Sequence, residues 1–170
     1  EGDSTFVKEL LTDGKCDIAF LRSESSSVKE FNSIPYMIDY LTAVLPATHP
    51  LAKADNLPFE QLRGETFLLF PEHSFINDLC IRECRNAGFE PHIAYTGNRG
   101  ATLIDLVRNG AGITLMMHHS ARQENDSSLA FIPVTPGIYS YISLNYAKEK
   151  PLSPQAESFV RYVKAHKRDF

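Results

Sequence analysis

The stretch "VRNGAGITLMM", residues 107–117, decides how the fold is read, because it joins a helical pattern to an apolar run. Residues at positions i, i+3, i+4 and i+7 form one face of a helix predicted over 101–109, namely Leu103, Leu106, Val107 and Gly110. A glycine loop that binds a dinucleotide follows a strand and opens a helix. Gly110-Ala111-Gly112 does the reverse, so we interpret Gly110 as the left-handed residue that ends the helix.

Apolar and β-branched runs elsewhere predict an alternation of strands and helices. Strands are expected at 17–21, 40–45, 66–70, 92–96, 112–116, 129–132 and 141–146. Helices are expected at 5–12, 75–87, 101–109 and 154–166, with Asp3 or Ser4, Ser74 and Ser153 as caps. This order favours an α/β fold with a largely parallel sheet.

The composition is that of a globular protein. The chain has 170 residues, is 43% hydrophobic, and carries a formal net charge of -4, which is a poor match to nucleic acid. Three cysteines without a disulfide framework fit a reducing compartment. No apolar run is long enough for a membrane helix, and the N-terminus does not look like a signal peptide. We therefore expect a cytoplasmic protein without membrane contact, with a mature secreted protein as the alternative.

Three predicted helix starts carry hydroxyls and backbone N–H groups that suit an anion. They lie at 2–5, at 72–75 and in the "YTGNRGATL" stretch, residues 95–103. Taken singly, each is more readily explained as a helix cap or an ordinary loop. Ligands of open α/β sheets sit beyond the carboxyl ends of the strands, where such starts gather. Together they favour a site for a small carboxylate or another polar metabolite.

Catalytic and metal-binding patterns are weak. The sequence contains no nucleophile elbow, no zinc-protease motif and no phosphate loop of the Walker type. Cys80 and Cys84 lie one helical turn apart, but no recognised zinc spacing completes the set, and we expect core cysteines. His118-His119 is interpreted as a solvated turn. The sequence thus predicts no enzyme, no metal site and no cofactor.

Three stretches taken together resemble a known family. They are "EGDSTFVKELLTDGKCDIAFL" (1–21), "YLTAVLPATHPLAKADNLPFEQLRGETFLLF" (40–70) and "AGFEPHIAYTGNRGATLIDLVRNGAGITLMM" (87–117), and the likeness extends through "LAFIPV" to the C-terminus. Their order is similar to that of the effector-binding domain of LysR-type transcriptional regulators. The resemblance covers essentially the whole chain, although each motif alone is degenerate.

The resemblance implies a fold similar to type II periplasmic binding proteins, with two α/β lobes of mixed, mainly parallel sheets joined by two crossovers. Lobe I is expected at 1–36 and 138–170, and lobe II at 37–137. The first strand and helix of lobe I would precede residue 1, so lobe I looks truncated. Arg22 falls near the mouth of the cleft, with no role assigned. Effector contacts are implied for Ser4, Thr5, Ser74, Phe75, Asn98, Gly100 and Tyr139.

The implied function is ligand sensing in a bacterial regulator. The effector would be a small polar or anionic metabolite, a carboxylate among the candidates, and the protein would form a homodimer or homotetramer. DNA would be bound only by a winged helix-turn-helix that the chain does not include. A solute-binding protein of a transporter is the alternative, because the same fold serves both classes.

Overall fold

The computed structural model describes residues 2–122 and 126–166 and divides the chain into two compact units. Unit 1 comprises Glu1–Asp39 and Tyr139–Phe170, and unit 2 comprises Tyr40–Ile138. The boundaries expected from the sequence were 36/37 and 137/138. Unit 2 is thus one continuous segment, whereas unit 1 is assembled from both ends of the chain.

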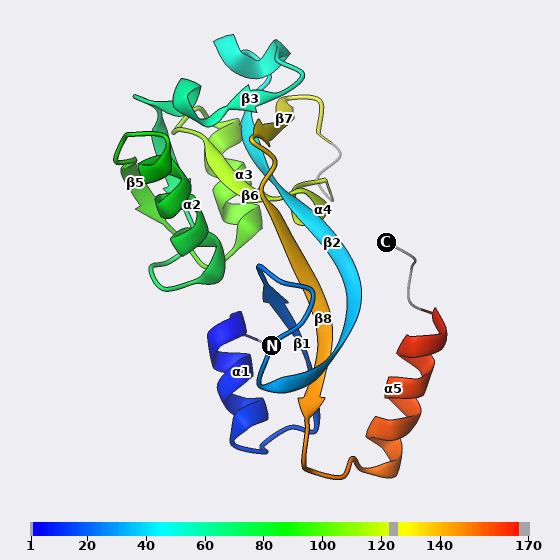
Figure 1. Ribbon diagram of the computed structural model, residues 1–170. Helices are drawn as coiled ribbons and strands as arrows, with labels where there is room; N and C mark the ends of the chain where they lie inside the picture. Colours follow the sequence, from blue (N-terminus) through cyan, green and yellow to red (C-terminus); the bar gives the residue numbers. More distant parts are fainter. Residues whose placement is uncertain (1, 123–125, 167–170) are drawn as a thin grey trace. The chain divides into compact units, whose positions relative to one another are not determined.

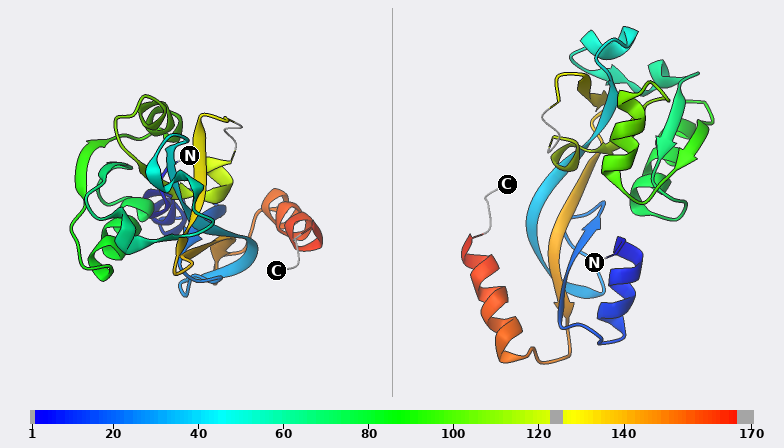
Figure 2. Two further views of the ribbon diagram at one scale, coloured as in Figure 1. Left: turned by 90° about the horizontal axis from the view of Figure 1, so that it is seen from above. Right: turned by 180° about the vertical axis from the view of Figure 1, so that it is seen from behind.

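Unit 1 is a sheet with one helix against each face (Figures 1 and 2). Its elements are α1 (Ser4–Thr12), β1 (Ile18–Ser23), the first half of β2 (Phe31–Pro46), β8 (Tyr139–Ala147) and α5 (Pro154–His166). The strand order is β1-β8-β2, with β1 antiparallel to β8. β8, the last of these three strands in sequence, therefore lies between β1 and β2.

Alternation along β1 separates the two cores of unit 1. Ala19 and Leu21 pack with Leu11 of α1, while Ile18 packs on the opposite side with Val160 and Val163 of α5. Successive side chains of a strand point to opposite faces, so one short strand supports both helices.

Unit 2 contains the remaining elements. They are the second half of β2, η1 (Pro50–Lys53), β3 (Leu57–Pro58), η2 (Phe59–Leu62), β4 (Thr66–Leu69), α2 (Phe75–Asn86), β5 (His92–Thr96), α3 (Gly100–Arg108), β6 (Thr114–Met117), α4 (His118–Ala121) and β7 (Leu129–Thr135). β6 and β7 are antiparallel to β2, and β3 is parallel to β7. β4 and β5 form a separate parallel pair.

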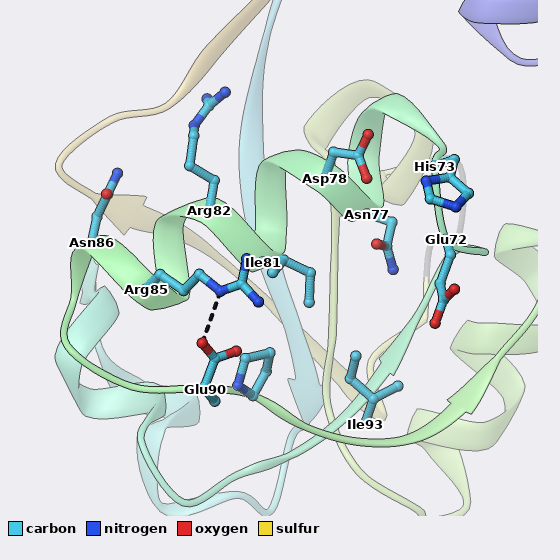
Figure 3. A pocket seen from close by; sticks show the side chains of 11 residues that line it. Glu72, His73, Asn77, Asp78, Ile81, Arg82, Arg85, Asn86, Glu90 and Ile93 are labelled. Atoms are coloured by element: carbon cyan, nitrogen blue, oxygen red, sulfur yellow. Dashed lines mark hydrogen bonds and ion pairs between the residues drawn. The ribbon is translucent and has the colours of Figure 1, made fainter.

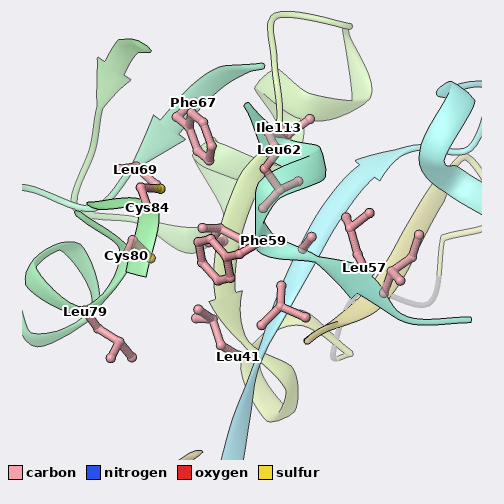
Figure 4. Packing of buried hydrophobic residues seen from close by; sticks show 14 of the residues in the cluster. Leu41, Leu57, Phe59, Leu62, Phe67, Leu69, Leu79, Cys80, Cys84 and Ile113 are labelled. Atoms are coloured by element: carbon pink, nitrogen blue, oxygen red, sulfur yellow. The ribbon is translucent and has the colours of Figure 1, made fainter. Parts of the chain in front are cut away.

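Two cores hold unit 2 together. The larger lies under α2 and η2 and includes Phe59, Phe67, Cys80 and Cys84, all fully or almost fully buried (Figure 4). The smaller lies under α3, where Leu103 and Val107 pack on Leu68 of β4 and Met116 of β6. The predicted core position of Cys80 and Cys84 is confirmed.

The α/β class and the mixed sheet are confirmed, and the four predicted helices lie within one or two residues of their expected bounds. Pairing is less parallel than expected, because β2, which continues from unit 1 into unit 2, runs antiparallel to both β6 and β7. The sequence did not predict 31–39 of β2, where Pro35 argues against a strand, nor β3, η1 and α4. The short helix that the family resemblance implies within 40–70 is present as η2.

Gly110 and Gly112, the two glycines of residues 107–117, are each required for a different structural reason. Gly110 has φ 75° and follows the end of α3, which confirms the left-handed helix end. Gly112 has φ 155°, and a Cβ there would overlap the carbonyl oxygen of Thr66. That carbonyl accepts the Ile113 amide at 2.8 Å, so it has no room to move.

We predict that Gly110→Ala destabilises the protein by about 1 kcal/mol, because only left-handed strain opposes it. Among the described residues, only atoms of its chain neighbours lie within 4 Å of the added Cβ. Gly112→Ala should lose about 3 kcal/mol or more, because the backbone of β4 must also shift. Urea unfolding of both variants measures the difference. Equal losses would contradict the packing role of Gly112.

A second prediction concerns the outer edge of β1, which no strand covers among the described residues. The Arg22 amide donates to Ser4 Oγ at 3.2 Å, so by alternation the Phe20 amide also points away from β8. We expect native-state hydrogen exchange to be fast at Phe20 and slow at Leu21 and across β6. Equal protection at all three places in a monomeric protein would contradict this.

Candidate functional site

The carboxyl ends of three strands meet on one side of unit 2. β4 is parallel to β5, and a parallel bridge between Phe67 and Ile113 brings β6 alongside β4. Each of these strands leads into a helix: β4 into α2, β5 into α3 and β6 into α4. Strand ends of this kind are where open α/β sheets hold their ligands.

Of the three predicted helix starts, that of α3 is the one that no described side chain caps. Its cap residue, Arg99, is extended at φ -113° and ψ 121°, and among the described residues no side chain caps the helix. A Cβ on Gly100 would lie 3.7 Å from Phe70 and 3.8 Å from Met116. The helix start therefore adjoins the end of β4 and the end of β6. Asn98, in the preceding turn, is exposed.

The start of α2 is more fully occupied. Ser74 Oγ accepts the Asn77 amide at 3.3 Å and donates to the Pro71 carbonyl at 2.7 Å. The buried Asn77 side chain donates to the Phe70 carbonyl at 2.8 Å, and Phe75 packs against the larger core. Ser74 and Phe75 thus hold the loop after β4 in place.

The start of α1, in unit 1, already holds a carboxylate. Asp3 Oδ1 accepts the amides of Thr5 at 2.8 Å and Phe6 at 3.1 Å. A negative side chain at a helix N-terminus is favourable, and it opposes a second anion there. Ser4 Oγ accepts the Arg22 amide and links α1 to β1.

His118 begins α4 at the end of β6, and its neighbours were not foreseen from the sequence. Its ring stacks on Tyr40 with centroids 4.4 Å apart, and its Nδ1 lies 3.4 Å from Thr42 Oγ1. The expectation that His118 lies in a solvated turn was wrong, because His118 is half-buried. His119 is exposed to solvent, as expected. Tyr40 and Thr42 are far from His118 in sequence, so local spacing held no signal for this contact.

Arg22 of unit 1 also has partners that sequence spacing did not reveal. Its guanidinium contacts the Asp39 carboxylate at 3.3 Å through both terminal nitrogens and donates to Ser140 Oγ at 2.6 Å. Burial lowers the pKa of Arg22, and Asp39 offsets part of that effect. Tyr139, beside Ser140, is exposed.

A separate groove of about 700 Å³ runs between α2 and β5. Ile81 and Ile93 point toward one another across it, and Arg85 reaches Glu90 at 2.8 Å (Figure 3). Its remaining charged lining is of both signs, so it shows no clear preference for an anion or a cation. Its lining includes Glu72 and His73, and His73 has φ 65°, which is unusual for a residue with a side chain.

Within residues 2–122 and 126–166, no group of three or more His, Cys, Asp or Glu side chains could hold a metal ion. None of the described helices combines the length and the apolarity that crossing a bilayer requires. Burial raises the pKa of the Cys84 thiol to about 12 and raises that of Cys80 well above its usual value. Both thiols are therefore protonated at neutral pH.

Comparison with known proteins finds relatives that are regulators of gene expression. GltC of Bacillus subtilis, a transcriptional dual regulator, is 26% identical over 164 residues, which are 96% of this chain and 55% of GltC. The hydrogen peroxide-inducible genes activator of Pectobacterium carotovorum is 25% identical over 158 residues, 92% of this chain and 52% of that protein. The chain spans about half the length of these curated relatives.

The fold has a solved counterpart as well. The regulatory domain of CcmR from Synechocystis, solved in complex with 2-PG, superposes with a TM-score of 0.87 at 16% identity, over 99% of this chain and 81% of that one. The LysR substrate binding domain family matches residues 1–168. From its sequence, its fold and its relatives, the chain belongs to the LysR substrate binding domain family.

Proposed function

We propose that this chain senses a small polar or anionic metabolite and passes that signal to DNA binding in a longer LysR-type regulator. The winged helix-turn-helix that contacts DNA would lie elsewhere in that protein. Such regulation requires the effector to bind two arrangements of the protein with unequal affinity. The family match favours this function over the transporter alternative.

The observation that carries the proposal is the uncapped start of α3 at the meeting point of β4, β5 and β6. Backbone N–H groups in the first turn of a helix have no intrahelical acceptor, and the helix dipole adds positive potential there. An anionic group of the effector is best accommodated at Gly100. Ser74 follows the end of β4, Asn98 follows the end of β5 and His118 follows the end of β6, so these side chains come from the neighbouring strand ends.

The same proposal defines what we expect of the whole protein. We expect no turnover of metabolites, a cytoplasmic location and assembly as a homodimer or homotetramer. Relatives of the chain are transcriptional regulators, which supports the first of these. In unit 1, Ser4, Thr5 and Tyr139 would offer neutral contacts, because Asp3 already occupies the α1 start.

Peroxide sensing, suggested by the names of three relatives, has less support. A thiol that reacts with peroxide needs thiolate character and exposure. Cys80 and Cys84 are fully buried and have raised pKa values. Cys16 is half-buried, and burial also raises its pKa.

Thermal-shift measurements with small mono- and dicarboxylates, each paired with its neutral amide, test the proposal. A carboxylate at 100 times its Kd should add about 2.7 kcal/mol of stability. Gly100→Pro removes one N–H donor, and the extended Arg99 before it tolerates a proline. We expect this variant to bind the carboxylate about tenfold more weakly or worse.

The matched control is Gly100→Ala, which keeps the donor and adds a methyl at ordinary contact distance from Phe70 and Met116. It should bind more tightly than Gly100→Pro. Equal affinity of the two variants would exclude the α3 start as the anion site. A ligand set made up only of neutral apolar molecules would overturn the anionic effector.

A further prediction separates metabolite sensing from thiol chemistry. Native protein treated with a maleimide at pH 7 should be modified slowly at Cys16 and not at Cys80 or Cys84, since buried, protonated thiols are unreactive. Mass spectrometry before and after unfolding in urea measures this. Rapid modification of Cys80 or Cys84 in folded protein, or their oxidation by stoichiometric peroxide, would favour a redox sensor.

A further inference from the structure

The chain leaves unit 1 once and returns to it once. It leaves between Asp39 and Tyr40, inside the uninterrupted strand β2, and returns between Ile138 and Tyr139, where β8 begins. Any change in the arrangement of the units must bend the chain at these two places. Contacts that fix the residues beside them therefore control that bending.

Arg22, in β1, contacts a residue beside each of these two places. Its backbone belongs to β1, and its guanidinium holds Asp39, the last residue before the chain leaves, and Ser140, the second residue after it returns. All three residues belong to unit 1. A planar guanidinium carries five donors in a rigid fork, so one side chain can fix two acceptors in different strands.

Burial makes this cluster costly to break. The side chain of Asp39 is 3% exposed and that of Arg22 is 17% exposed, while Ser140 is fully buried. A charge-assisted hydrogen bond in such surroundings is stronger than one on the surface, and removing one partner takes away part of what compensates the other buried charge.

A backbone hydrogen bond ties the same two segments on the unit 2 side. The Leu41 amide donates to the Ile138 carbonyl at 2.8 Å. Besides the pairing of β8 with β2 in the sheet, the two passages are thus joined by a main-chain bond just inside unit 2 and by the Arg22 side chain just inside unit 1. Only the second of these joints can be altered by a substitution that leaves the backbone intact.

We propose that Arg22 is a positioning residue that clamps the two connecting segments together through Asp39 and Ser140 and so fixes where the chain bends between the units. The clamp acts in the ligand-free protein and is independent of the effector's identity. Without it, the segments around 39–41 and 138–140 open more often, while the cores of both units stay closed.

Hydrogen exchange of the full 170-residue chain tests the clamp, with the Leu41 amide as reporter. Arg22→Met removes the charge and the donors but keeps the Arg22 amide bond to Ser4. We expect exchange at Leu41 to become at least about tenfold faster. The Leu68 amide, which donates to the Ile113 carbonyl in the unit 2 core, should change less than about twofold.

Arg85→Met is the matched control, because it removes an exposed ion pair with Glu90 within unit 2. It should leave Leu41 unchanged. Ser140→Ala keeps the ion pair and removes the bond from Arg22 to Ser140, so it should give a smaller rise at Leu41 even where Arg22→Met fails to fold. Arg22→Lys should restore part of the protection. No change at Leu41 in folded Ser140→Ala and Arg22→Met protein, or an equal rise at Leu41 and Leu68, overturns the proposal.

Discussion

Two hydrogen bonds between β4 and Ile113, the residue before β6, determine where the candidate site lies. The Ile113 amide donates to the Thr66 carbonyl, and the Leu68 amide donates to the Ile113 carbonyl, each at 2.8 Å. They hold β6 parallel beside β4, so both strands end on the same side of unit 2. The approach is close enough that only a glycine fits at position 112. Of the two glycines that at first suggest a phosphate loop, Gly112 therefore aligns two of the strands whose ends form the candidate site, while Gly110 only ends α3.

The sequence predicted most of the helices, because their caps and apolar stripes are local signals. Ser74 and Gly110 mark the start of α2 and the end of α3 in the structure, as expected. Ligand binding at the α3 start stays a prediction, and the structure shows that no described side chain caps this helix. The sequence left Asp3 and Ser4 open as the cap of α1, and the side-chain geometry identifies Asp3.

Other features depend on residues that are distant in sequence. His118 was read as a solvated turn because its neighbours, Tyr40 and Thr42, come from a strand more than seventy residues earlier. Arg22 acquires a structural role only when β1, β2 and β8 are placed side by side. The first half of β2 was missed because Pro35 interrupts its strand pattern, and its pairing with β8 in the sheet outweighs that local preference.

The central place of β8 in unit 1 bears on how the protein forms during synthesis. Strands β1 and β2 leave the ribosome early, but they are not neighbours in the sheet, and the strand between them is made more than ninety residues after β2. Unit 2 is complete once Ile138 has emerged, and it can collapse while unit 1 still lacks its middle strand. Unit 1 then completes its sheet when β8 pairs with both β1 and β2. Pairing between strands so distant in sequence is slow, and until it forms the unpaired backbone N–H and C=O groups of β1 and β2 are accessible to chaperones.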